Sequence, residues 1–421
     1  MRHFRIISTI LVSAAFCPQV FAQAPVSLPQ RVTLESKLPS VASALNIEGG
    51  KLAGPGAAIL QTAISQANYI LIGEDHITRE IPRFAGAVCD AMGATGGFSA
   101  MAFEASPAAA RFVQDSLKGS DRLAKMADLQ KRFPASIAFL NVRDENDLAA
   151  HCAAASQHTG FQVWGLDQDF IGSAGWIIER MIATSPGPKA RAEILRLQEL
   201  ERTCAEEARK TGDPSKLFML TVSDPEIEKA SAAIEVDGTP ATRKEFFELT
   251  ESRVIYRENG TNPSESNRRR SLLMKKNFSD YKAADGNGSN QRVLLKFGDW
   301  HLYKGINPLH QRDIGNFIAE FADGHGVTSL HILILGARGT HALFAGYDRP
   351  MRNEPFIMDQ DDDYRWLKPV IDDQKPGTWT LYDLRQLRFR HLEMSENWDR
   401  VVYGYDLLVI IPELSPAELI Y

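Results

Sequence analysis

The chain has 421 residues, and its 47 Lys and Arg against 53 Asp and Glu give a formal net charge of −6 at pH 7. This acidic balance argues against a nucleic-acid partner and gives no reason to expect an anionic membrane surface as partner. The length is sufficient for one large domain or for two domains that each bury a sizeable core.

The N-terminal segment predicts a secretory signal peptide. Arg2 and Arg5 form a basic start, residues 6–16 form an apolar run, and Ala22 provides a small residue before a cleavage point. Cleavage there removes two bases and no acid, which changes the charge to −8, from 45 bases and 53 acids. The residue before Cys17 is too large for lipidation. We therefore expect a periplasmic or secreted chain that has no transmembrane span once it is mature.

Three cysteines remain after that cleavage: Cys89, Cys152 and Cys204. Their number is odd, and no C-x-x-C spacing is present. In an oxidising compartment two of them can form a disulfide, but the sequence does not select the pair, and three buried thiols are equally compatible with it. Cys89 lies on the apolar face of a predicted helix, which favours a buried thiol at that position.

Residues 23–55 carry proline and serine and few large apolar clusters, so we expect a leader that lies over the domain. Helices and strands alternate over the first half of the predicted core, residues 56–171. The apolar spacing predicts a helix near 56–66, a strand at 69–73, a helix at 78–92, a strand at 98–103, helices from Ser106 to 159 and a strand at 161–165. This βαβαβ alternation predicts a parallel sheet.

Residues 172–288 are charged, have helical spacing and contain no convincing strand, so they predict a large helical insertion. The insertion contains a basic cluster at residues 267–270. The second half of the core, residues 289–421, returns to strand patterns at 291–298, 329–335, 378–381 and 407–411, with a helix at 312–321. The predicted fold is therefore α/β, with a parallel or mixed central sheet, flanking helices and a duplicated half-motif.

A four-residue unit occurs twice, each time at the end of an apolar strand. Gly-Glu-Asp-His occupies residues 73–76, and Gly-Asp-Trp-His occupies residues 298–301. A carboxylate two residues before a histidine on an extended chain can orient the imidazole and raise its basicity. The same donors can bind a divalent metal ion. A single copy is also compatible with a structural histidine, but the repetition favours a functional site. Its residues are Glu74, His76, Asp299 and His301.

Further carboxylates are expected at the same edge of the sheet, where open α/β folds bind their ligands. Glu104 ends the second predicted strand, and Asp167 and Asp169 follow the third. Carboxylates gathered in one place repel one another unless they are protonated, paired with arginine or bound to metal. Arg79, beside Glu80 in the first turn of the next helix, is our candidate to pair with one of them or to stabilise an anionic intermediate. An ordinary surface arginine is the alternative.

Other catalytic patterns are missing from the sequence. It contains no G-x-S-x-G, Walker A, G-x-G-x-x-G or H-E-x-x-H motif. His331 heads an apolar strand, so we expect a histidine that is buried for structural reasons. The doubled unit is therefore the main source of functional hypotheses.

The order and strand context of these blocks resemble the superfamily of erythromycin esterases, ChaN-like haem-binding lipoproteins and Tiki/TraB-type metalloproteases. The resemblance rests on residues 71–81, 101–105, 164–169 and 296–304. It implies an α/β core with a duplicated half, each half contributing a Gly-x-x-His. By position, Glu74 and His76 match the first family motif, Glu104 the second, and Asp299 and His301 the last.

In the esterase branch, the resemblance implies a histidine base that activates water against an ester, assisted by a glutamate and an arginine. In the Tiki-type branch the same positions hold a divalent metal, and the ChaN-like branch binds haem. The spacing Gly-Glu-Asp-His-Ile departs from the usual Gly-Glu-x-x-His-Gly of the esterases and is closer to the other two branches.

Our hypothesis is an exported hydrolase that acts on a small molecule or a peptide. His76 or His301 would activate water, and Arg79 would stabilise developing negative charge. Glu74, Glu104 and Asp299 would orient the histidines or hold a metal, with Glu80, Asp167 and Asp169 in supporting positions. The alternative is a haem- or iron-binding protein without turnover.

Overall fold

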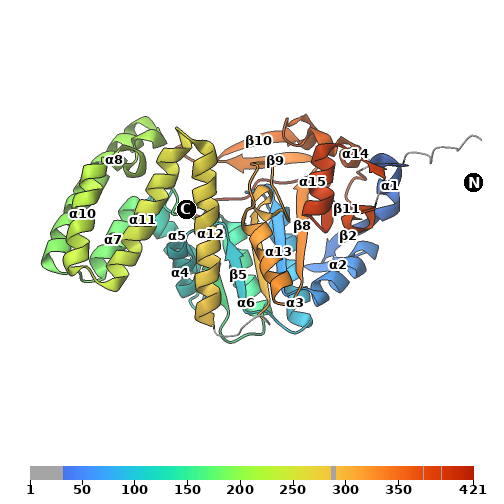
Figure 1. Cartoon of the computed structure of the whole chain (residues 1–421), viewed down its shortest axis with the longest axis horizontal. Helices are drawn as coiled ribbons and strands as arrows, with labels where there is room; N and C mark the ends of the chain where they lie inside the picture. The colour runs from blue at the N-terminus through green and yellow to red at the C-terminus, as the bar shows by residue number, and fades with distance from the viewer. Residues whose placement is uncertain (1–31, 286–290, 373, 390) are drawn as a thin grey trace, which may run out of the picture.

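The computed structural model describes residues 32–285, 291–372, 374–389 and 391–421 (Figure 1). The predicted signal peptide lies outside these ranges. Within them, none of the helices combines the length and the apolar character that are required to cross a bilayer.

A mixed sheet of nine strands forms the centre of the described chain, in the order β3-β2-β11-β13-β8-β4-β7-β5-β6. The six strands from β13 to β6 are parallel, and β11, β2 and β3 add an antiparallel edge. The predicted α/β fold with a mixed sheet is therefore confirmed. The strand bounds are Ala42–Glu48 (β2), Lys51–Ala53 (β3), Tyr69–Glu74 (β4), Ala100–Phe103 (β5), Gln162–Gly165 (β6), Val293–Gly298 (β7), Ser329–Gly336 (β8), Trp379–Asp383 (β11) and Leu407–Ile411 (β13).

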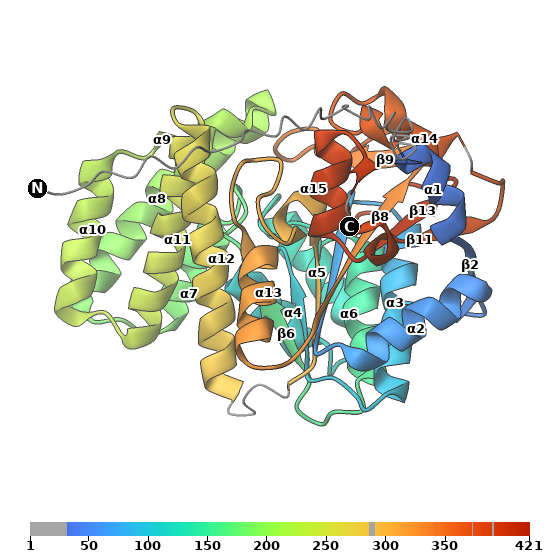
Figure 2. The ribbon, with the colours of Figure 1, turned by 45° about the vertical axis from the view of Figure 1, so that its right-hand side comes forward.

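Each face of the sheet is covered by helices because the parallel strands carry apolar residues on both sides. In β4, Ile70 and Ile72 belong to one buried cluster, whereas Tyr69 and Leu71 belong to the other. The first cluster includes side chains of α2 (Pro55–Gln66), α3 (Glu80–Ala94), α4 (Pro107–Ser116), α5 (Arg122–Arg132) and α6 (Arg143–Ala155). The second includes α1 (Leu34–Val41), α12 (Pro263–Asp285), α13 (Ile314–Gly324) and α15 (Glu396–Gly404), and α12, α13 and α15 lie toward the viewer in Figure 2.

The described part of the predicted insertion is helical, and no strand is assigned within it. Figure 1 shows these helices gathered at one side of the sheet, with α12 between the sheet and the rest. They are α7 (Ala174–Ala183), α8 (Pro188–Thr211), α9 (Phe218–Thr221), α10 (Asp224–Asp237), α11 (Pro240–Asn259) and α12. The division into an insertion and two half-cores stays a prediction.

The register of the sheet places the two copies of the repeated unit side by side. Strands β4 and β7 are neighbours, with Gly73 opposite Phe297 and Glu74 opposite Gly298. Strand β5 lies on the other side of β7, and its last residue, Phe103, is opposite Lys296. The loops after β4, β5 and β7 therefore emerge at one edge, within reach of one another.

Two parts of the chain differ from expectation. The described part of the predicted leader supplies α1, β2 and β3, and β2 pairs with β11 inside the sheet, where Leu45 is fully buried. A hairpin of β9 (Arg338–Leu343) and β10 (Arg352–Ile357) was also not predicted. Its residues are mostly exposed or half-buried, so it lacks the apolar alternation that identifies a strand in a sequence. The shorter elements are β1 (Val32–Thr33), β12 (Leu392–Glu393) and α14 (Lys368–Ile371).

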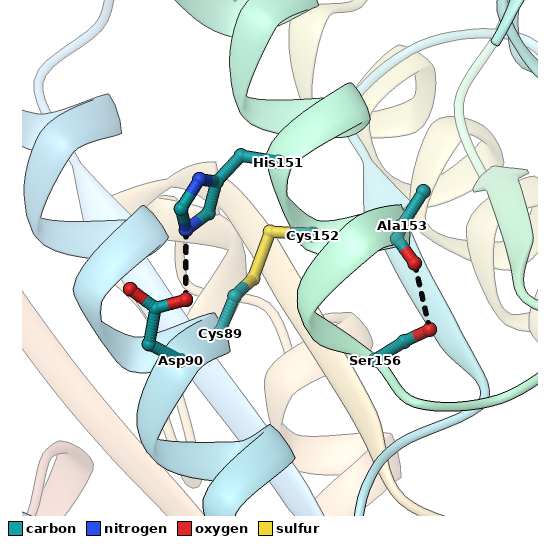
Figure 3. The surroundings of a disulfide bond; sticks show 6 residues. All are labelled: Cys89, Asp90, His151, Cys152, Ala153 and Ser156. Carbon is teal, nitrogen blue, oxygen red and sulfur yellow. Dashed lines mark hydrogen bonds and ion pairs between the residues drawn. A yellow bond between two sulfur atoms is a disulfide. The ribbon is translucent and has the colours of Figure 1, made fainter.

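A disulfide joins Cys89 of α3 to Cys152 of α6, with 5.3 Å between their Cα atoms (Figure 3). The prediction of a buried thiol at Cys89 is therefore wrong, although the residue is fully buried as its place on the apolar face implied. Cys152 is buried on the facing helix, so the packing of α3 against α6 brings the two together. Cys204 is the free cysteine of the described chain.

We expect the Cys152→Ala variant to be less stable than the parent, because the disulfide closes a loop with a sequence separation of 63 residues. A cross-link of this kind contributes about 2–4 kcal/mol by restricting the unfolded chain. Urea unfolding of both proteins, with and without reductant, measures the difference. Cys204→Ala is the control and should keep the parent's sensitivity to reductant. Equal stability of parent and Cys152→Ala under oxidising conditions would contradict the assignment.

Candidate functional site

The carboxylate of Glu104 is the centre of the site. It is buried, and it lies directly after β5. Its Oε2 is 3.3 Å from Nε2 of His76, and its Oε1 is 3.5 Å from Nε2 of His301. Oε2 also accepts a hydrogen bond of 2.7 Å from the backbone N–H of Gly298. The two predicted histidines therefore share one carboxylate.

A second carboxylate binds the other ring nitrogen of each histidine. Nδ1 of His76 is 2.9 Å from Oε1 of Glu74, which is the pairing expected within the first unit. Nδ1 of His301 is 2.7 Å from Oδ2 of Asp313. Asp313 also caps α13 by accepting from the backbone N–H of Ile314, so its position is fixed. Both imidazole rings are held in defined orientations.

The charges explain the protonation of this group. Burial acts to lower the pKa of His76, but the carboxylates of Glu104 and Glu74 outweigh it and raise that pKa from 6.5 to about 10. The pKa of His301 is also raised, since Glu104 and Asp313 outweigh its burial. Burial acts to raise the pKa of Glu104, but both histidines and Arg270 hold it well below its usual range. The surrounding histidines and arginine therefore keep Glu104 in its ionised form.

Arg270 of α12 supplies the cation that the sequence analysis assigned to Arg79. Its Nε donates to Asp167 at 2.9 Å, and its terminal nitrogen donates to Glu104 at 2.6 Å. Arg79 instead pairs with Glu418 and leaves 42% of its side chain exposed, so the prediction that it binds a carboxylate of the sheet edge is wrong. The sequence did signal a basic cluster at 267–270, but helix packing decides which of its arginines faces the sheet.

A buried lysine lies behind His76. Lys296 of β7 donates to both Glu74 and Glu145, and all three side chains are almost completely buried. Burial raises the pKa of Glu145 to about 7, while Lys296 acts to lower it. Sequence reasoning missed Lys296 and Glu145, although a lysine inside an otherwise apolar strand was a visible signal. The lysine fixes the carboxylate that orients His76.

Three other predicted residues lie apart from this centre. Asp299 is buried and accepts a hydrogen bond of 2.9 Å from the hydroxyl of Tyr364, and burial raises its pKa to about 7. Asp169 is buried, its backbone N–H donates a hydrogen bond of 2.9 Å to the hydroxyl of Ser252 in α11, and burial raises its pKa to about 7 as well. Glu80 accepts a hydrogen bond of 2.8 Å from the backbone N–H of Ser415, so it holds the C-terminal segment.

The predicted metal ligands Glu74, His76, Asp299 and His301 do not form a metal site. In the described ranges, no group of three or more His, Cys, Asp or Glu side chains is arranged to hold an ion. Lys296 neutralises Glu74, and Arg270 neutralises Glu104. With these cations in place, the donors do not fit a divalent metal ion.

The glycines of the two repeated units, Gly73 and Gly298, are packed so closely by neighbouring side chains that a larger residue would not fit. A Cβ atom on Gly298 would lie 2.8 Å from Nε2 of His76 and 3.3 Å from Glu104. A Cβ atom on Gly73 would collide with the hydroxyl of Tyr405. His76 and Glu104 can therefore approach the end of β7 only because Gly298 lacks a side chain, and Gly73 leaves space for Tyr405.

A cavity of about 300 Å³ opens onto His76, Glu104, Asp167 and Arg270. The ring of Phe139 forms part of its wall and stacks on the imidazole of His76, with 4.1 Å between the ring centres. The side chain of His76 is 25% exposed and that of His301 is 10% exposed. His76 is therefore the histidine that an entering molecule meets first.

The backbone beside His76 is held in a strained conformation by the C-terminal segment, residues 414–420. Ile77 has a φ of 66°, which is unfavourable for a β-branched residue. Its carbonyl accepts a hydrogen bond of 3.2 Å from the backbone N–H of Ala417. Farther along, the N–H of Ile420 donates to the carbonyl of Asn141, close to Phe139. One segment thus fixes both loops that border His76.

Comparison with known proteins shows what fold this site occupies. No family model and no curated protein matches the chain. Among solved structures, a mutant of the erythromycin esterase EreC in its open conformation has a TM-score of 0.63 at 13% identity, over 90% of this chain and 99% of that one. A protein from Bacillus cereus has a TM-score of 0.59 at 14% identity, over 91% of this chain and 98% of that one. A succinoglycan biosynthesis protein has a TM-score of 0.58 at 15% identity, over 91% and 97%.

These matches confirm, at the level of the fold, the resemblance that the sequence motifs indicated. ChaN of Campylobacter jejuni with bound haem is also matched, with a TM-score of 0.27 at 12% identity over 70% of this chain.

We expect the pairing of His76 with two carboxylates to make the protein less stable at alkaline pH. Its pKa in the folded chain, about 10, lies above the ordinary value of 6.5. The stabilisation is therefore fully present below about pH 6.5 and is lost as the pH rises through about 10. Melting temperatures of the parent and of His76→Gln across this range test it, and the parent should show the steeper loss. An NMR titration of His76 with a midpoint near its ordinary value would contradict the expectation.

We expect Lys296→Met to unfold more easily by about 3–5 kcal/mol, because two buried carboxylates lose their cation. Chemical denaturation measures this loss, and adding Glu145→Gln to the variant should recover part of it. Lys276→Met is the matched control, because Lys276 pairs with Asp280 on the surface and leaves 56% of its side chain exposed. That change should cost about 0–1 kcal/mol. Equal effects of the two lysine substitutions would contradict the role of Lys296.

Proposed function

We propose that this chain is an exported hydrolase that cleaves an ester or amide bond of a small molecule in the cavity beside His76. One observation carries the proposal. Two oriented imidazoles share the buried carboxylate of Glu104, and one of them, His76, opens into a cavity of about 300 Å³. Pairs of histidine and carboxylate serve as general bases for water when a substrate can reach them.

The contact between His76 and Glu104 is the point at which water would enter. At 3.3 Å it is longer than the 2.7–2.9 Å that is typical of charge-assisted hydrogen bonds. When water and substrate separate the two groups, His76 loses a main cause of its raised pKa and can release its proton to solvent. Neutral His76 then accepts a proton from the water at Nε2, with Glu74 holding its other nitrogen.

The hydroxide formed in this step would attack the carbonyl carbon, and the carbonyl π electrons would move to the oxygen. Arg270 lines the same cavity and would stabilise that negative charge. When the tetrahedral intermediate collapses, the bond to the leaving alcohol or amine breaks. His76 returns its proton to the leaving group, so the base is regenerated.

The haem-binding alternative has no comparable support in the arrangement of the site. Both ring nitrogens of His76 and of His301 contact carboxylates, so a histidine of this site would have to give up one of these contacts to become an axial ligand. Export is supported by the N-terminal sequence pattern and by the Cys89–Cys152 disulfide, since such bonds persist in oxidising compartments.

We expect His76→Ala and Glu104→Gln each to lower kcat by about 10²–10⁴-fold on any ester or amide that the parent hydrolyses. A panel of chromogenic esters and amides measures turnover, with and without a chelator, and the chelator should have no effect because the donors do not fit a metal.

The matched control for this experiment is His151→Ala. His151 pairs with Asp90 on the surface, beside the disulfide (Figure 3), and leaves 49% of its side chain exposed. It should keep parental turnover. Unchanged turnover in both His76→Ala and Glu104→Gln would contradict the proposed function. A Soret band that appears when haem is titrated into the parent, and is absent in His76→Ala, would favour haem binding instead.

A further inference from the structure

A second, larger cavity adjoins the catalytic one. It has a volume of about 570 Å³, within the range of about 300–1,000 Å³ that is usual for small-molecule sites. Most of its lining is apolar and comes from α5, from the loop after α5, from the loop between β9 and β10 and from the C-terminal segment. The apolar side chains that only this cavity contacts include Ala127, Phe344, Met351 and Leu419.

The two cavities are separated by a single layer of side chains. Ile137, Ala138, Phe139 and Phe170 line both of them. Phe139 stacks on His76 and also forms part of the wall of the larger cavity. A molecule that places a reacting bond at His76 therefore needs to pass only this layer to reach the larger cavity.

The backbone of this layer is also unusual. Phe139 has a φ of 59°, and Ala135, which lines the larger cavity, has a φ of 53°. Left-handed conformations of residues other than glycine cost about 1–3 kcal/mol each and persist where the surroundings enforce them, often at ligand sites. The ring of Phe139 between the cavities is therefore carried by a backbone in an unfavourable conformation.

The chemistry of the lining selects an apolar occupant. The charged residues of the larger cavity, Lys131, Asp348 and Arg349, are all exposed. The rest of its lining is mainly apolar and includes the uncharged polar side chains of Gln130 and Asn141. A polar group buried there would lose its hydrogen bonds to water, whereas a hydrocarbon chain would gain by leaving water.

We propose that the larger cavity binds the acyl part of the substrate, so that the favoured substrates are esters with long, unbranched hydrocarbon acyl chains. The inference rests on the proposed function, since it takes the carbonyl group to be held at His76. Phe139 then determines specificity, because the chain has to pass its ring.

Nitrophenyl esters of acetate, hexanoate and dodecanoate test the proposal by turnover. We expect kcat/KM to rise by about fourfold for each methylene that enters the cavity, which corresponds to about 0.8 kcal/mol per buried CH₂. In Ala127→Trp, where the indole occupies the larger cavity, the preference for dodecanoate over acetate should fall at least tenfold. Ala124→Trp is the matched control. It lies on the same helix outside this cavity and should keep the preference.

A binding measurement separates failure of this inference from failure of the proposed hydrolysis. A dansyl-labelled long-chain fatty acid should bind with increased fluorescence to the parent and to Ala124→Trp, and at least tenfold more weakly to Ala127→Trp. If no ester is hydrolysed but this pattern holds, the proposed function fails and the chain-binding cavity stands. Equal binding by both tryptophan variants, or none by the parent, overturns the inference.

Phe344→Ala gives the same test if Ala127→Trp does not fold. The side chain of Phe344 is 44% exposed, so removing it should not affect folding, and it contacts Phe170 with 5.7 Å between the ring centres. Loss of this apolar surface should weaken binding of the labelled fatty acid at least threefold. Unchanged binding in this variant overturns the inference as well.

Discussion

The burial of one carboxylate, that of Glu104, is the constraint on which the rest of the site depends. A buried charge is tolerated only when hydrogen bonds and opposite charges replace its lost water. The partners of Glu104 come from four places in the chain: the loop after β4, the end of β7, the short helical turn that carries His301, and α12. Each segment has to be in position before the charge is satisfied, so the sheet order and the placement of α12 are coupled through one side chain.

The sequence predicts well the features that depend on neighbouring residues. Strand ends show as apolar runs that stop at glycine, and a parallel sheet brings such ends to one edge. The proximity of Glu74, His76, Glu104 and His301 could therefore be inferred. Arg270 and Glu145 could not, because they come from helices, and neither could Asp313, which caps the start of α13. Which face of a helix meets the sheet depends on the packing of the whole domain, and a periodic pattern does not specify the partner of that face.

The differences elsewhere have similar causes. Strand β2 lies in the part of the chain that was predicted to be a leader. It was not recognised as a strand because it belongs to the antiparallel edge of the sheet, where most of its residues are only partly buried. Asp299 has the same spacing in its unit as Glu74 but accepts from Tyr364 instead of orienting a histidine. After Glu74, which ends β4, the first unit continues without helical structure. The second unit enters a helical turn, Asp299–Leu302, so the two carboxylates are placed differently relative to their histidines. The same two-residue spacing between carboxylate and histidine therefore leads to a direct contact in the first unit but not in the second.

The C-terminal segment makes the site a product of the complete fold. It borders His76 through Ile77 and borders Phe139 through Asn141, and the hydrogen bond from Ser415 to Glu80 joins residues 335 positions apart. A contact of such long sequence separation requires the chain to lose the entropy of closing a very large loop. A chain that has folded its sheet but not yet docked this segment would contain the motif residues without their proper geometry. The geometry of the proposed site is thereby tied to completion of the fold, because the last segment of the described chain also holds the two loops beside His76.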